Sequence, residues 1–196
     1  TLFDYFLVNL ARLDKDIFII SGNHDSAERI SFASRIMEER KIHLSPVYNG
    51  CISPIILNDG KIEVAFYMLP FIKPSVVLHY AEEGTEIKSY DDAMRYVISK
   101  MEIDRSRCNV LITHQFVTGA ERSESEDYIV GGLDNIDAFV FKDFDYVALG
   151  HLHRPQSCGK ATIRYSGSPL KYSFSEVNDK KSISIVEITG GKAPVI

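Results

Sequence analysis

Asp145-Tyr146-Val147-Ala148-Leu149-Gly150-His151-Leu152-His153 is the stretch that decides the fold. It is an apolar run that ends in a glycine and is followed by two histidines with one residue between them. Such a run predicts a buried strand that stops at a turn and presents both imidazoles at its end. Because alternate residues of an extended segment point to the same side, His151 and His153 could bind one metal together, or one each of two adjacent metals. Two incidental histidines are the alternative interpretation.

Two further apolar runs lead into histidines upstream. Ile17-Phe18-Ile19-Ile20 precedes Ser21-Gly22-Asn23-His24-Asp25, and Cys108-Asn109-Val110-Leu111-Ile112 precedes Thr113-His114-Gln115. Open α/β sheets bind ligands beyond the carboxyl ends of their strands, so the three motifs are expected at one sheet edge. For the first motif the alternative is an Asx turn that caps the next helix, and both interpretations can hold at once.

The rest of the chain shows the patterns of a mixed α/β domain with no internal linker or repeat. A strong hairpin signal, Asn58-Asp59-Gly60, separates two β-rich runs. His43 and His79 have no partner nearby in sequence and are interpreted as structural. The polar segment Thr118–Gly132 is long enough to be functional or mobile. Helical patterns cover Leu2–Leu13, Ala27–Arg40 and Ser89–Met101, and further strands are expected at Ile52–Leu57, Lys61–Leu69, Thr162–Tyr165 and Ser182–Ile188.

Composition is that of an ordinary globular protein, with 196 residues, 45% hydrophobic and 25% charged. No apolar run approaches the ~20 residues of a membrane span. The net charge of −5 weighs against non-specific nucleic-acid binding by the chain as a whole, although it leaves room for a local basic groove. Three cysteines without CxxC spacing predict reduced thiols and a cytoplasmic location. The helical pattern at Leu2 starts without a cap, as if the chain were cut from a longer protein.

The chemistry of these motifs favours a transition metal. Imidazoles and an amide oxygen suit Mn, Fe or Zn better than Mg or Ca, which prefer shells made only of oxygen. Two such metals about 3.5–4 Å apart are suited to the hydrolysis of phosphate esters.

The three motifs Gly22-Asn23-His24-Asp25, Thr113-His114-Gln115 and Gly150-His151-Leu152-His153 resemble, in the same order, the third, fourth and fifth motifs of the calcineurin-like metallophosphoesterases. Within that family, the residues around the last two motifs and the run Ile163–Glu176 are similar to nuclease subunits of bacterial complexes that process DNA double-strand ends. The resemblance covers nearly the whole chain. It implies one α/β domain over residues 1–196, with a metallophosphoesterase-type β-sandwich of mixed sheets flanked by helices.

The resemblance also implies roles for individual residues. The metal in this family is typically manganese. His24 would orient the phosphate and protonate the leaving group, and Asp25 would support it. Arg154 and the loop Ser166–Ser168 would lie near the site without an assigned role. The second metal would be held by Asn23, His114 and His151, and the first metal by His153.

The chain departs from the family at its start. The family's first two motifs, an Asp-x-His and a Gly-Asp-x-x-Asp, are absent from the 196 residues and would precede Thr1. They supply two aspartates and a histidine of the two-metal site. We therefore expect these residues alone to show weak metal affinity and negligible nuclease activity, with any bound metal on the His151 side. The smaller capping domain and the segment that docks the partner ATPase are likewise expected to be absent.

The function implied by the resemblance is that of a metal-dependent exonuclease and endonuclease subunit in DNA end processing and repair. Its partners would be DNA, an ATPase subunit and a second copy of itself. The helix Leu2–Leu13 is a candidate for the dimer contact, and the alternative is that its apolar stripe packs on the sheet. A phosphoesterase acting on a nucleotide or a small phosphodiester is one alternative function. A non-catalytic binding module for DNA or a protein partner is another.

Overall fold

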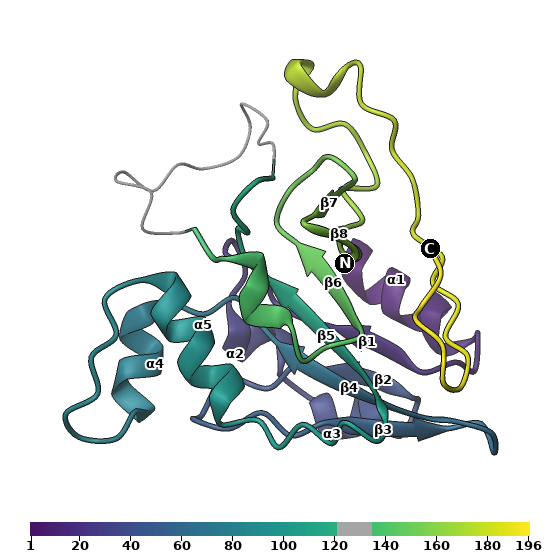
Figure 1. Cartoon of the computed structure of the whole chain (residues 1–196). Coiled ribbons are helices and arrows are strands. Elements are labelled where there is room, and N and C mark those ends of the chain that lie inside the picture. The colour runs from purple at the N-terminus through teal and green to yellow at the C-terminus, as the bar shows by residue number, and fades with distance from the viewer. Residues whose placement is uncertain (121–134) are drawn as a thin grey trace.

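The computed structural model describes residues 1–120 and 135–196, and a six-stranded sheet is its main element (Figure 1). Most of the predicted functional segment Thr118–Gly132 lies outside the described residues. The four inner strands are parallel, and the two outer strands are antiparallel to their neighbours. The strand order is β3 (Ile55–Asn58), β4 (Glu63–Leu69), β5 (Cys108–His114), β6 (Tyr146–Gly150), β8 (Lys160–Tyr165) and β7 (Gln156–Cys158).

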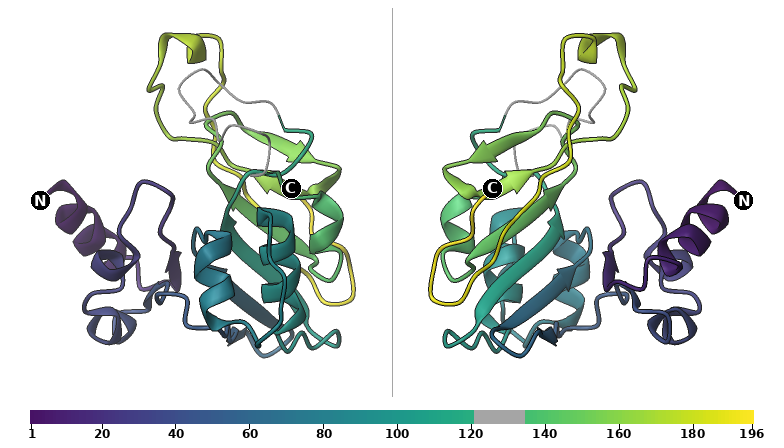
Figure 2. Two further views of the ribbon diagram at one scale, coloured as in Figure 1. Left: turned by 90° about the vertical axis from the view of Figure 1, so that its left-hand side faces the viewer. Right: turned by 90° about the vertical axis from the view of Figure 1, so that its right-hand side faces the viewer.

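A smaller unit at the N-terminus lies to one side of this sheet (Figure 2). It contains a parallel pair of short strands, with Phe18 opposite His43 in the register. The single helix predicted over Ala27–Arg40 is wrong, because the structure breaks it into two. Ala33 has a φ of 60°, and a residue in this left-handed region cannot continue a right-handed helix. The elements are α1 (Leu2–Ala11), β1 (Ile17–Ile19), α2 (Ala27–Ile30), α3 (Ser34–Glu38) and β2 (Ile42–Leu44).

The hairpin predicted around Asn58-Asp59-Gly60 is confirmed as the antiparallel pair β3 and β4. The second β-rich run alternates from Ile62 to Met68, which predicts a half-buried strand, but β4 is buried on both faces. Its Tyr67 side packs in the main core beneath two helices, α4 (Pro74–Tyr80) and α5 (Tyr90–Ser99). Its Val64 side packs with residues of the C-terminal tail. A parallel strand covered on both faces loses the polar alternation of a half-exposed strand.

The two helices over the sheet begin with recognisable signals. α5 begins with a capping box, in which the Ser89 hydroxyl accepts from the Asp92 backbone N–H and the Asp92 carboxylate accepts from the Ser89 N–H. Pro74 lies in the first turn of α4. Proline is tolerated there because the N–H that it lacks would have no partner within the helix.

The strand predicted over Ser182–Ile188 is wrong. In the described part of the chain this segment forms one isolated bridge, between Glu187 and Val195, and Ile183 is 89% exposed. Val186 and Ile188 pack against the face of the large sheet instead of pairing along its edge. Ser182–Ile188 is therefore part of a tail that lies across one face of the sheet, with Val186 and Ile188 as its apolar contacts. The described residues also contain two short 3-10 helices, η1 (Ala138–Phe141) and η2 (Phe174–Glu176).

The mixed α/β class is confirmed. None of the helices in the described residues is long and apolar enough to cross a membrane. The four parallel strands bring their carboxyl ends to a common edge of the sheet, and the motifs of His114 and of His151 and His153 follow two of these ends. The motif of Asn23 follows β1 of the smaller sheet instead.

Candidate metal centre at the carboxyl edge of the sheet

The parallel register of β5 and β6 places two motifs side by side. The register ends with His114 opposite Gly150, so that His151 follows directly beyond the paired region. The imidazole rings of His114 and His151 lie 5.3 Å apart between centroids, in an edge-to-face arrangement. Two of the histidines singled out in the sequence are therefore neighbours in space.

The loop after β1 comes to the same place from the smaller sheet. The backbone N–H of Phe71, just past β4, donates to the Ser21 carbonyl at 3.0 Å and holds the loop to the large sheet. The Asn23 side-chain oxygen lies 2.9 Å from Nε2 of His114, across 91 residues of chain. Asp25 closes the loop on itself, because its carboxylate accepts from the Gly22 N–H at 2.8 Å.

Two glycines make room for the His114 ring. A Cβ atom on Gly22 would lie 2.8 Å from Cε1 of the ring, and one on Gly150 would lie 2.8 Å from Nδ1. Both distances are shorter than real Cβ contacts, so the ring and a side chain could not occupy these places together. The glycines before Asn23 and before His151 are therefore packing requirements of His114.

His114 is held as a neutral imidazole. Burial lowers the pKa of His114 from 6.5 to about 4, and repulsion from His151 and then from His24 and His153 contributes further, while Asp25 acts in the opposite direction. The neutral form is the one that can bind a metal. The other three histidines of the motifs therefore all lie within electrostatic range of His114.

His151 adopts a strained backbone conformation. Its φ of 109° lies in the region that non-glycine residues seldom occupy. Such outliers cost of the order of 1–3 kcal/mol and are found where the surrounding structure enforces them, often at functional sites. The turn after Gly150 thus holds the His151 side chain at the sheet edge at a conformational cost.

His153 is anchored by a carboxylate that the sequence did not single out for any role. Nδ1 of His153 lies 2.9 Å from Oε1 of Glu176, a residue of η2 with no exposed surface. Lys181 donates to the other oxygen of Glu176 at 2.7 Å and to the His153 carbonyl at 2.8 Å. The one available signal was that Glu176 closes the run Ile163–Glu176, which carries much of the family resemblance.

Arg154 and the loop Ser166–Ser168, which had no assigned role, both make contacts close to His153 in the chain. Nε of Arg154 donates to the buried Asp179 carboxylate at 3.0 Å. The Ser168 N–H donates to the His153 carbonyl at 3.1 Å. A Cβ atom on Gly167 would lie 2.8 Å from that same carbonyl oxygen, and Gly167 has a φ of 80°. The loop Ser166–Ser168 therefore supports the turn that carries His153.

A buried tyrosine hydroxyl fixes the chain beyond His114. Tyr165, at the end of β8, donates to the Gln115 carbonyl at 2.7 Å and accepts from the Val117 N–H at 2.9 Å. Both contacts are buried. His24 and Asp25, the predicted catalytic pair, are exposed on the loop after β1.

The donor set is compatible with one metal ion on the His151 side. The Asn23 oxygen and Nε2 of His114 lie 2.9 Å apart in a hydrogen bond, which brings two candidate donor atoms together. No group of three or more His, Cys, Asp or Glu residues in residues 1–120 and 135–196 has the arrangement of a metal site. The centre is thus a partial one, built from an amide oxygen and imidazoles.

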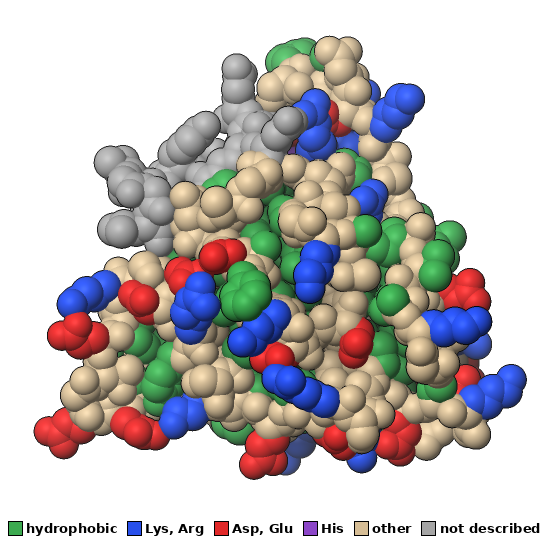
Figure 3. All heavy atoms as spheres, viewed as in Figure 1, with side chains coloured by type: hydrophobic (Ala, Val, Ile, Leu, Met, Phe, Trp, Pro, Cys, Tyr) green, Lys and Arg blue, Asp and Glu red, His purple; other side chains and the backbone are tan. Residues whose placement is uncertain are grey.

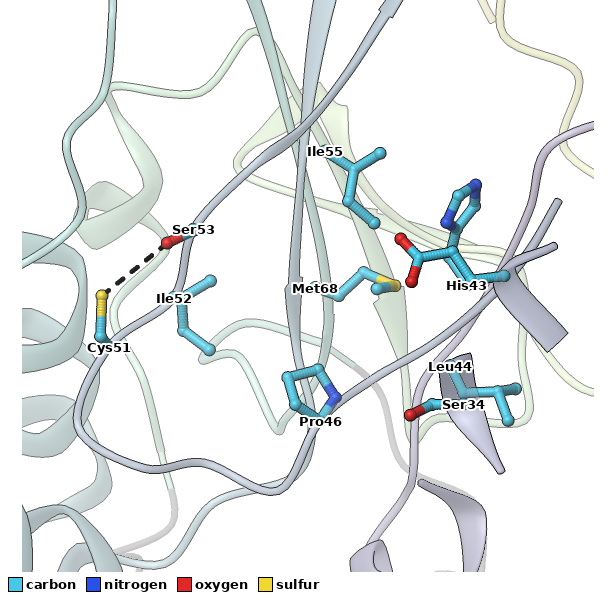
Figure 4. Close-up of a pocket in the computed structure, with 10 residues that line it drawn as sticks. Ser34, His43, Leu44, Pro46, Cys51, Ile52, Ser53, Ile55 and Met68 are labelled. Atoms are coloured by element: carbon cyan, nitrogen blue, oxygen red, sulfur yellow. Dashed lines mark hydrogen bonds between the residues drawn. The ribbon is translucent and has the colours of Figure 1, made fainter. Parts of the chain in front are cut away.

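A pocket lies away from these motifs, between β2 and β3 (Figure 4). It is a cavity of about 210 Å³, with His43 and Leu44 on one side and Cys51 and Ile52 on the other. Nε2 of His43 lies 2.8 Å from the Asp16 carboxylate, and the ring stacks on Phe18. None of the predicted site residues lines this cavity.

Fold and site together define a mixed α/β chain in which a loop amide and several histidines come together near the carboxyl edge of a largely parallel sheet. The chain is similar to the D subunit of the SbcCD nuclease of Staphylococcus epidermidis, with 37% identity over 175 residues. The match covers 88% of this chain and 46% of that relative, so the chain spans about half the length of the curated protein that it matches. No family model matches the chain.

Proposed function

We propose that this chain is part of a metal-dependent nuclease that hydrolyses phosphodiester bonds in DNA, acting as exonuclease and endonuclease in DNA end processing and repair. The observation that carries the proposal is the contact between Asn23 and His114, which joins two sheets at the edge where His151 also lies. A likeness to a nuclease subunit over 88% of the chain supports it. The calcineurin-like metallophosphoesterase architecture, with its sandwich of two mixed sheets, belongs to the same proposal.

The metal would be manganese, in a two-metal site of which this chain holds part. Asn23, His114 and His151 would hold one ion, and His153 would ligate the other. When bound, such ions hold phosphate oxygens and provide a nucleophile near neutral pH. The lowered pKa of His114 and the glycines around its ring fit this role, because they keep the imidazole neutral and fixed.

The exposed loop after β1 would supply the proton. His24 is exposed at the surface, whereas the proposed ligands Asn23, His114 and His151 are half-buried. We assign to His24 the orientation of the phosphate and the protonation of the leaving oxygen. Asp25 holds the loop closed through the Gly22 N–H and so fixes where His24 stands.

The partners would be DNA, an SbcC-type ATPase subunit and a second copy of the chain. On the face shown in Figure 3, Lys and Arg side chains alternate with Asp and Glu side chains, so this face offers no broad basic patch for DNA. We therefore place DNA contact at the metal edge. The helix α1, which contains no buried residue, is the candidate for the dimer contact. A cytoplasmic location fits the three free cysteines.

The decisive experiment measures cleavage of linear duplex DNA by the complete gene product that carries this sequence, with and without Mn²⁺. We expect cleavage that requires Mn²⁺ and that Mg²⁺ or Ca²⁺ does not support in its place. The variant His114→Ala should not cleave the duplex in the presence of any of these ions. His79→Ala serves as the matched control, since His79 packs against Tyr80 away from the motifs. Absence of cleavage together with hydrolysis of a nucleotide or small phosphodiester would favour the alternative substrate class.

The 196 residues tested alone should cleave far more slowly than the complete gene product. The described residues supply no cluster of carboxylates and imidazoles that could hold two ions. A non-catalytic role in binding DNA or a partner is the remaining alternative, and it predicts DNA binding without cleavage in both forms.

A further inference from the structure

Glu176 is a fully buried carboxylate that contacts a proposed metal ligand. It ends the 3-10 helix η2, where the neighbouring Phe174 is fully exposed. A carboxylate is seldom buried completely unless it is paired and hydrogen-bonded. Its contacts therefore show what holds it in place.

The two oxygens of Glu176 face different partners. Oε1 lies 2.9 Å from Nδ1 of His153. Oε2 accepts from the Lys181 ammonium at 2.7 Å and from the Tyr172 backbone N–H at 3.4 Å. Lys181 is itself held, because it also donates to the Ser168 hydroxyl at 3.1 Å. Both of these contacts to Oε2 come from donors.

We propose that Glu176 is a positioning residue that fixes His153 in the tautomer with its hydrogen on Nδ1, and that Lys181 determines which oxygen faces the imidazole. An ionised carboxylate only accepts hydrogen bonds, so the ring nitrogen beside it must carry the hydrogen. The lone pair is then on Nε2, which is the nitrogen that would ligate a metal. The inference deepens the proposed function and rests on it for the role of His153.

The substitution Glu176→Gln tests this with little change in shape. The amide oxygen of Gln must face Lys181 and the Tyr172 N–H, because both are donors. The NH₂ group then faces Nδ1 of His153 and requires it to accept. The hydrogen moves to Nε2, and the imidazole presents the wrong nitrogen. A comparable tautomer change accounts for the activity that serine-protease triads lose when an amide replaces their carboxylate.

The measurement is the tautomer of His153 by NMR of the complete gene product labelled with ¹⁵N-histidine, free of metal and at alkaline pH. We expect hydrogen on Nδ1 in the wild type and on Nε2 in Glu176→Gln. Glu187→Gln, at an exposed glutamate in the same tail, should match the wild type. Hydrogen on Nε2 in the wild type, or on Nδ1 in Glu176→Gln, would overturn the proposal.

A second variant guards against misfolding. Glu176→Gln leaves Lys181 without its nearest counter-charge, whereas Glu176→Gln combined with Lys181→Met removes both charges of the ion pair. Without the ammonium the amide is free to turn, so we expect part of the Nδ1–H form to return. No return in the folded double variant would contradict the part assigned to Lys181.

Manganese binding gives an independent readout. Loss of a carboxylate that orients a metal-binding histidine commonly weakens metal affinity by about 10- to 100-fold, and we expect a loss of that size in Glu176→Gln but none in Glu187→Gln. An unchanged affinity would contradict the proposal. The tautomer is measured without metal or DNA, so its outcome is separate from the cleavage assay that decides the proposed function.

Discussion

Gly150 lies opposite His114 in the register of β5 and β6, and the His114 ring fills the space that a side chain on Gly150 would need. The strand that delivers His151 therefore also sets the position of His114. The positions of the proposed ligands His114 and His151 therefore both depend on Gly150, which has no side chain.

Gly150→Ala should displace the His114 ring, because the new methyl group would lie 2.8 Å from Nδ1. We expect a loss of stability of about 1–3 kcal/mol from overpacking and a larger proportional loss of Mn²⁺ affinity. Chemical denaturation and titration calorimetry measure the two effects. Gly190→Ala is the matched control, because its methyl group would lie equally close, at 2.8 Å, to Cγ2 of Ile62 and would not meet His114. Equal losses of Mn²⁺ affinity in both variants would disprove the packing argument.

Tyr165→Phe should destabilise the protein by about 1–3 kcal/mol, because it leaves the buried Gln115 carbonyl and Val117 N–H without their partner. Urea denaturation provides the measurement. Tyr5→Phe, at a tyrosine that is largely exposed, should change stability by less than about 0.5 kcal/mol. A similar small change for Tyr165→Phe would show that water replaces the hydroxyl.

The metal-free protein should lose stability as the pH falls from about 6.5 to about 4. In that window the unfolded chain protonates His114, whereas the folded protein, in which burial lowers the pKa of His114 to about 4, does not. The loss attributable to this group is at most about 3 kcal/mol and is complete below the folded pKa. Denaturation at several pH values in the presence of a chelator measures it. His114→Gln should flatten the pH dependence in this window, and an unchanged slope would refute the assignment.

Replacing Leu2 and Phe6 with serine should leave the fold intact and abolish self-association. Both side chains are more than half exposed, and α1 buries none of its residues. Sedimentation of the complete gene product over a range of concentrations tests this. Ile183→Ser, at another exposed apolar residue, is the control and should not affect association. A monomeric wild type would remove the basis of the proposed dimer.

The three strand-then-histidine patterns were enough to predict that the motifs would come together. Each apolar run carried its own signal, and the rule for the carboxyl ends of parallel strands placed His114 and His151 at one edge of the sheet. The strand before Asn23 belongs to a second, two-stranded sheet, which the patterns did not predict. The contact between Asn23 and His114 follows from topology, which is why residues 91 apart in sequence could be assigned to one place.

Contacts that depend on tertiary packing alone were not predictable. Glu176 and Lys181 lie in an irregular segment without periodicity, and nothing local indicates that one charge will be fully buried beside the other. The break at Ala33 and the unpaired tail at Ile183 have the same origin. In each case the residues carried a regular pattern, but the surrounding structure determined the conformation.

The position of Asn23 and His114 on two different sheets has a consequence for motion. The small sheet meets the large one through the stack of Phe18 on Phe66 and the backbone bond from Phe71 to Ser21. Opening of this seam would part the two donors while both sheets stayed folded, and a bound ion would act as a latch across it. Amide hydrogen exchange near Ser21 should then slow on addition of Mn²⁺, whereas exchange in the centre of β5 should not change.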